Sequence, residues 1–160
     1  MTTISPGRLS AFLVEAKRRT YAGLDDDATV STPAFAGAKQ LEYRDDGLSY
    51  RDIYFGMAYF VGQEVVSSGD RAIWSMSYAG GLVPGITDRA EVIAIYAFLR
   101  RCLLRIEVEL PFRGPLLFDD AEFRYVNEPE GDLAAFSGVE QITRSGVEAY
   151  RLRYNGGIIR

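Results

Sequence analysis

One stretch of this sequence occurs twice, and that repetition constrains the fold more than any other feature. A pattern of aromatic, glycine, glutamate and aliphatic positions in residues 60–83 recurs 76 residues later, in residues 136–159. We interpret this as an internal duplication. The chain is therefore expected to form one domain, 1–160, built from two similar halves at about 5–85 and 86–160. The matched pairs are Phe60 and Phe136, Gly62 and Gly138, Glu64 and Glu140, Val66 and Ile142, Trp74 and Tyr150, Met76 and Leu152, Tyr78 and Tyr154, and residues 80–83 with 156–159.

Two amphipathic helices are expected, one at the start of each half. Ser5-Pro6 is a helix-start pair, with serine as the N-cap and proline at the first helical position. Asp88 and Glu91 have the spacing of a capping box, and apolar residues follow them at helical intervals. The polar side of the first helix is assigned to Glu15, Lys17, Arg18 and Arg19.

Short runs of alternating polar and apolar residues predict antiparallel strands. In the first half they cover 40–44, 48–55, 59–67 and 72–78, and Asp45-Asp46-Gly47 is a hairpin turn. In the second half they cover 118–126, 135–143 and 148–154, with a polar turn at 127–132. The fold class is therefore α+β: helix-plus-meander halves forming a curved antiparallel sheet with two helices on one side. Residues 21–39 are expected to be a loop, whose acidic triplet 25–27 lacks the ligand spacing of a calcium site.

Composition narrows the classes of function. The chain has no histidine, which removes histidine-based triads and histidine metal sites, and we expect neither a metal nor another cofactor. A net charge of -4 argues against a nucleic-acid surface. The one cysteine, Cys102, lies in an apolar helical pattern and is interpreted as a small buried hydrophobe in a reducing compartment. No signal peptide pattern or membrane-spanning apolar run is present, so we expect a cytoplasmic protein that does not contact membranes.

Glu64 and Glu140 are the residues that most need a physical explanation. Strand parity places each of them on the apolar face of its strand, so both carboxylates are expected to point inward. An inward carboxylate must be hydrogen-bonded, protonated or open to a solvent-filled pocket. Two structural alternatives stay open. Each glutamate is a brace that accepts hydrogen bonds from tyrosine hydroxyls or backbone amides, or a bulge at the preceding glycine turns it outward.

A pocket between the halves is the interpretation that gives these carboxylates a function. It predicts a protein that binds a small cationic or aromatic molecule in an acidic, aromatic-lined cleft. The candidate ligand-binding residues are Glu64, Glu140, Tyr54, Trp74, Tyr78 and Tyr154. The alternative is a cofactor-independent acid–base enzyme, an isomerase, cyclase or lyase, with Glu64 and Asp52 as catalytic residues. A third hypothesis is a structural or interaction module, in which the duplication serves stability and homodimer formation.

Several motifs also resemble a bacterial domain family of unknown function. They are Tyr50-Arg51-Asp52-Ile53-Tyr54-Phe55-Gly56, Phe60-x-Gly62-Gln63-Glu64-Val65-Val66, Glu130-Gly131-Asp132, Phe136-Ser137-Gly138-x-Glu140 and Tyr154-Asn155-Gly156-Gly157. Members of that family occur alone or fused to helix-turn-helix regulators, so the resemblance implies sensing or ligand binding. More distantly, the order of elements is similar to gyrase-inhibitor-like drug-binding domains. That similarity implies an acidic centre at Glu64 or Glu140 for cationic organic ligands.

Overall fold

A computed structural model describes residues 4–20 and 32–160. Within them the order of elements is α1 (Pro6–Thr20), β1 (Lys39–Asp45), β2 (Leu48–Gly56), β3 (Tyr59–Ser68), β4 (Arg71–Leu82), α2 (Arg89–Leu103), β5 (Leu117–Asp120), β6 (Phe123–Asp132), β7 (Ala135–Arg144) and β8 (Val147–Ile158). The strands form one antiparallel sheet in the order β1-β2-β3-β4-β8-β7-β6-β5. The last strands of the two predicted halves, β4 and β8, pair with each other in the middle of this sheet.

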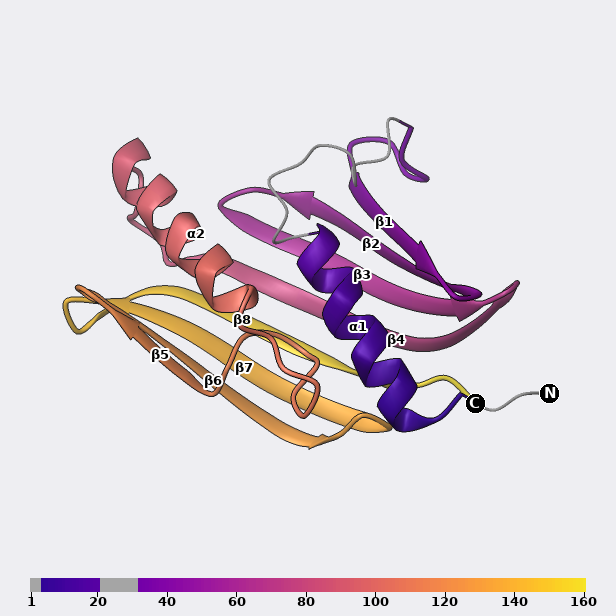
Figure 1. Cartoon of the computed structure of the whole chain (residues 1–160). Coiled ribbons are helices and arrows are strands. Elements are labelled where there is room, and N and C mark those ends of the chain that lie inside the picture. The colour runs from indigo at the N-terminus through magenta and orange to yellow at the C-terminus, as the bar shows by residue number, and fades with distance from the viewer. Residues whose placement is uncertain (1–3, 21–31) are drawn as a thin grey trace.

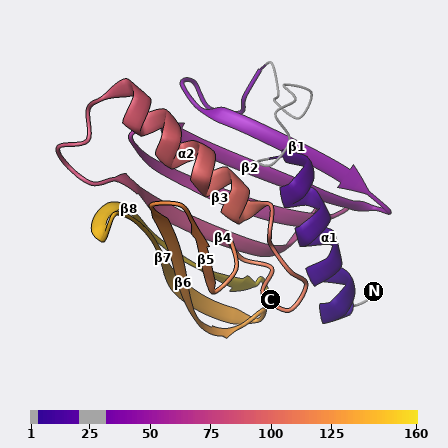
Figure 2. The same ribbon diagram turned by 60° about the vertical axis from the view of Figure 1, so that its left-hand side comes forward.

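Both helices lie on the same face of the curved sheet (Figures 1 and 2). The first helix, α1, packs against β1 and β2, and α2 packs against β6. The α+β fold expected from the sequence is therefore confirmed. We call the covered side of the sheet the helix face and the opposite side the helix-free face.

The register of the sheet decides which residues share a face. Asp52, Glu64 and Met76 are directly opposed across β2, β3 and β4 and therefore point to the same side. No register shift occurs at Gly62 or Gly138; the two irregularities in the β3–β4 and β7–β8 pairs come later, after Val66 and Ile142. Parity is thus kept up to both glutamates, and the outward-turned alternative is excluded.

Local sequence signals set the ends of several elements. The Ser5 hydroxyl oxygen accepts a hydrogen bond from the Arg8 amide (3.3 Å), and Asp88 Oδ1 accepts one from the Glu91 amide (2.9 Å), as N-caps do. Asp46 and Gly47 both have positive φ (45° and 77°), which a tight β1–β2 hairpin requires. The predicted helix starts and this hairpin are confirmed.

The second half differs from the sequence prediction between residues 117 and 132. The expected strand over 118–126 is two strands, β5 and β6, separated by a short turn in which Ala121 has a φ of 53°. The expected polar turn at 127–132 is wrong, because these residues continue β6. Glu128 and Glu130 look like turn residues but are the exposed members of an alternating strand.

The core lies between the sheet and the two helices. Its largest fully buried side chains include Trp74, Tyr50, Tyr125, Tyr150 and Phe98. The thiol of Cys102 is also completely buried, and burial raises its pKa to about 12, which agrees with its interpretation as a small hydrophobe. Neither helix is both long and apolar enough to span a bilayer, among the residues described. The expected loop at 21–39 lies mostly outside the described part of the chain; residues 32–38 precede β1 without regular structure.

Candidate functional site

Glu64 lies in a buried polar cluster on the helix face. Lys17 from α1 places its Nζ 2.9 Å from Glu64 Oε2, and both side chains are at most 2% exposed. The same ammonium donates a hydrogen bond to the carbonyl of Phe112. On the two strands that flank β3, the Tyr78 hydroxyl of β4 donates a hydrogen bond to Asp52 Oδ1 of β2 (2.7 Å). We call Lys17, Asp52, Glu64 and Tyr78 the first cluster.

Glu140 lies in a similar cluster. It opposes Asn127 of β6 as Glu64 opposes Asp52 of β2. Glu140 Oε1 accepts hydrogen bonds from Arg113 (2.7 Å) and from the Tyr150 hydroxyl (2.8 Å), while Oε2 accepts one from the Tyr125 hydroxyl (2.6 Å). Beside it, the Tyr154 hydroxyl donates to Asn127 Oδ1 (2.8 Å). These residues form the second cluster. Each glutamate is therefore held by a protein cation and, in the second half, by two tyrosines.

Burial decides the protonation chemistry of the tyrosines in these clusters. Burial raises the pKa of Tyr78 well above its ordinary value, and the Asp52 carboxylate raises it further. Burial and Glu140 act in the same way on the pKa of Tyr125 and of Tyr150. These hydroxyls therefore stay protonated near neutral pH. They act as hydrogen-bond donors and not as bases.

The predicted position of Lys17 on α1 is wrong. The sequence placed it on the polar side of the helix, but it is 3% exposed and faces the sheet. Burial lowers its pKa, and Glu64 opposes that shift. A positional signal was available, because Lys17 follows Leu13 by four residues and so continues the apolar stripe. Arg113 carried no such signal, since it lies in the connection after α2, where no periodicity exists.

The glycines beside the glutamates have a steric role. The ring of Tyr78 covers Gly62, and the ring of Tyr154 covers Gly138. A Cβ atom at Gly62 would overlap both the Tyr78 ring and the Cβ of Tyr54. The position thus has room for a hydrogen atom only.

Replacing Gly62 with alanine is expected to lower the free energy of unfolding by about 1–3 kcal/mol, because the added methyl forces the Tyr78 ring off Asp52. Gly7 in α1 is the matched control, since a Cβ there meets no atom within 4 Å. Its alanine variant should be neutral or more stable by up to about 1 kcal/mol. Urea denaturation of both variants measures the difference. Equal stabilities would show that the Tyr78 ring moves at no cost.

The six predicted ligand-binding residues do not converge on one cavity. Glu64, Glu140 and Trp74 are completely buried on the helix face, and Trp74 stacks on Phe136 (ring centroids 5.7 Å apart). Tyr54 is half-buried beside Phe60. Tyr78 and Tyr154 are among the residues that line a groove, although their hydroxyls bond Asp52 and Asn127 on the helix face. Asp52, the other candidate catalytic residue, is also completely buried.

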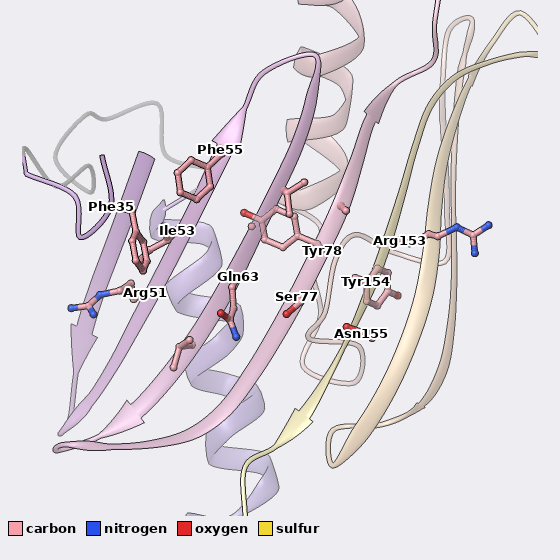
Figure 3. A pocket seen from close by; sticks show the side chains of 14 residues that line it. Phe35, Arg51, Ile53, Phe55, Gln63, Ser77, Tyr78, Arg153, Tyr154 and Asn155 are labelled. Carbon is pink, nitrogen blue, oxygen red and sulfur yellow. The ribbon is translucent and has the colours of Figure 1, made fainter. Parts of the chain in front are cut away.

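That groove lies on the helix-free face, over β2, β3, β4 and β8 (Figure 3). Its volume is about 580 Å³, within the range of small-molecule sites. The small side chains of Ser77 and Ala79, both on β4, form the floor at its centre. The described lining residues are Phe35, Arg51, Ile53, Phe55, Val61, Gly62, Gln63, Val65, Ser77, Tyr78, Ala79, Arg153, Tyr154 and Asn155.

Phe35 reaches this face because Gln40 holds the segment before β1. Gln40 faces the helix-free side opposite Ile53, and its Oε1 accepts a hydrogen bond from the Ala34 amide (2.8 Å). The adjacent Phe35 ring lies 6.5 Å from the Phe55 ring, centroid to centroid. Phe35 was not a sequence candidate. It sits in a stretch without periodicity, so no pattern indicated where its side chain points.

One comparison with known proteins gives a match. Residues 52–159 match the family described as "Domain of unknown function (DUF5680)", which is more than half of the chain. The chain belongs to this family. The match contains Glu64, Arg113 and Glu140 but leaves α1, with Lys17, outside it. No curated protein sequence and no solved structure matches the chain.

Among the described residues, no three acidic or thiol side chains converge as a metal-binding group. The carboxylates of the two clusters face ammonium, guanidinium and hydroxyl donors instead. These clusters therefore have the chemistry of internal braces.

Proposed function

We propose that this protein binds a small apolar molecule in the groove on its helix-free face. The observation that carries the proposal is a set of exposed apolar side chains gathered there. Phe35 is 59% exposed, Phe55 44% and Val61 50%. Leaving such a contiguous surface in water costs free energy, and surfaces of this kind in soluble proteins are typical of binding sites.

The groove supports an aromatic or aliphatic ligand better than a cationic one. Its described lining contains two arginines and no aspartate or glutamate. A cationic ligand at Glu64 or Glu140 would have to displace Lys17 or Arg113, which already hold these carboxylates at 2.9 and 2.7 Å. We therefore place the ligand on the opposite side of the sheet and give the glutamates the role of braces.

The geometry favours binding over acid–base catalysis. Asp52 and Glu64 are completely buried on the helix face and do not line the groove. Tyr78, which does line it, keeps its proton because burial and Asp52 raise its pKa. None of these groups is placed to exchange a proton with a ligand in the groove.

The wider role we propose is ligand sensing in the cytoplasm. Sensing is supported by the resemblance of the motifs to a family that also occurs fused to regulators, and by the similarity of the order of elements to drug-binding domains. The single buried cysteine fits a reducing compartment. A homodimer would be compatible with this proposal if the groove stayed open.

Titration with the uncharged fluorescent dye N-phenyl-1-naphthylamine tests the proposal. The dye should bind the wild-type protein with enhanced emission, and Phe55→Ser should weaken binding about tenfold, because a phenylalanine side chain contributes about 1.5–3 kcal/mol when buried. Ile93→Ser on α2 is the matched control, since Ile93 is 58% exposed outside the groove. Circular dichroism melting should show that both variants fold. If the wild-type protein does not bind the dye, or Phe55→Ser binds it like Ile93→Ser, the groove is not a binding site.

A further inference from the structure

The two sides of the groove differ in chemistry. Across β2, β3, β4 and β8, one row of directly opposed residues is Phe55, Val61, Ala79 and Arg153. Both large apolar side chains of that row are at its β2–β3 end and the guanidinium is at its β8 end. In Figure 3 Arg153 stands on the side of the groove opposite Phe35 and Phe55. The groove is thus amphipathic along the direction that crosses the strands.

The neighbouring row shows the same gradient with uncharged polar groups. It runs Ile53, Gln63, Ser77 and Asn155, so an aliphatic residue at β2 gives way to two amides and a hydroxyl. Ser77 and Asn155 are both exposed on the helix-free face. Their hydroxyl and amide groups can donate hydrogen bonds to a ligand that lies across the central strands.

The charge of the polar side comes from a single guanidinium. Arg51, the other arginine of the groove, is engaged by Glu42 (Nε to Oε1, 2.9 Å). Arg153 is exposed and takes part in none of the ion pairs formed between described residues. Its row continues through Val139 to Glu128, which lies two strands away and forms no ion pair with it. Arg153 therefore keeps its charge and its donors for an external partner.

We infer that the ligand is an amphipathic anion. Its apolar ring or chain lies against Phe35, Phe55 and Val61, and its carboxylate, sulfonate or phosphate group meets Arg153. This inference rests on the proposed function and adds the chemical class of the ligand to it. Arginine suits the role because its planar guanidinium presents paired donors to an oxyanion and sheds water more easily than an ammonium.

Two dyes with the same ring system isolate the contribution of the anionic group. 8-Anilino-1-naphthalenesulfonate is N-phenyl-1-naphthylamine with a sulfonate added. The sulfonate dye should bind about three- to tenfold more tightly than the neutral dye, the size expected for an exposed, charge-assisted contact. Arg153→Gln should abolish this difference and leave the neutral dye unaffected. Added salt should reduce the difference as well.

Arg124→Gln is the matched control. Arg124 is exposed and paired with Asp119 outside the groove, so its loss changes the net charge equally without touching the site. Equal affinities for the two dyes, or an anion preference that survives Arg153→Gln, would overturn the anionic class while binding in the groove stands. If Arg124→Gln loses the preference for the sulfonate dye as fully as Arg153→Gln does, the preference comes from net charge alone. That result would also overturn the anionic class. Failure of both dyes to bind would refute the proposed function itself.

Discussion

Replacing Lys17 with methionine is expected to lower the free energy of unfolding by about 3–5 kcal/mol, the usual cost of removing one member of a buried ion pair. Methionine matches the four-atom stem of lysine without its ammonium and keeps the helix propensity of α1, so the loss reports the missing ammonium. That ammonium lies 2.9 Å from Glu64 Oε2 and also binds the Phe112 carbonyl. Chemical denaturation followed by circular dichroism measures the change.

Two further variants define the origin of that loss. Arg19→Met removes an ion pair from the same helix, but the Arg19 and Glu15 side chains are 67% and 43% exposed, so its cost should be only a small fraction of the Lys17→Met cost. The double variant Lys17→Met/Glu64→Met removes both charges and should recover at least half of the loss, because apolar replacements of buried pairs are often close to neutral. A Lys17→Met cost as small as that of Arg19→Met would mean that the pair does not stabilise the fold.

Replacing Glu140 with glutamine is expected to cost about 3–5 kcal/mol although the two side chains have the same shape. Both carboxylate oxygens accept hydrogen bonds, from Arg113, Tyr125 and Tyr150. A glutamine amide puts an NH₂ group against one of these donors and leaves the Arg113 guanidinium in the interior without its carboxylate. If the NH₂ group takes the Oε2 position, it faces the Tyr125 hydroxyl, which donated to that carboxylate oxygen. The Tyr125 oxygen already accepts a hydrogen bond from the Gly114 amide (3.0 Å).

Glu148→Gln is the control for this substitution. Glu148 pairs with Arg151 at 2.6 Å, but the two side chains are 36% and 41% exposed, so water replaces the lost contact at a cost below about 1 kcal/mol. Urea denaturation curves of both variants should have similar slopes and different midpoints. Equal midpoints would contradict the role of Glu140 as a brace.

Parity within strands made much of the fold and the direction of the glutamates predictable. Because a strand alternates strictly, the shared face of Phe60, Gly62 and Glu64 followed from sequence alone, and no register shift intervenes before Glu64. Helix starts were predictable for a similar reason, since the Ser5 and Asp88 caps depend on adjacent residues. These features are local and need no knowledge of what packs on them.

The partners of the glutamates were not predictable, because they depend on tertiary contacts. Lys17 was assigned by residue type, and its burial becomes favourable only when α1 packs on the sheet and brings it to Glu64. Arg113 reaches Glu140 from a connecting segment with no repeating pattern. The same lack of pattern hid Phe35, whose place depends on the hydrogen bond between Ala34 and Gln40.

The groove was missed for a different reason. The predicted site was placed among inward-facing residues, because carboxylates are unexpected there. The outward residues of β2 and β3, Phe55 and Val61, read as ordinary strand members in sequence. Only the sheet order places them opposite the small residues of β4 and the guanidinium of β8.

The pairing of β4 with β8 also limits how this protein can respond to a ligand. The two strands are joined along nine residue pairs, from Trp74–Ile158 to Leu82–Tyr150, in the middle of a single sheet. Hinge closure of the two sides of the sheet around a ligand is therefore not available, because it would break the main-chain hydrogen bonds between β4 and β8. We expect a bound molecule to act locally instead, on the 32–38 segment that carries Phe35 beside the groove.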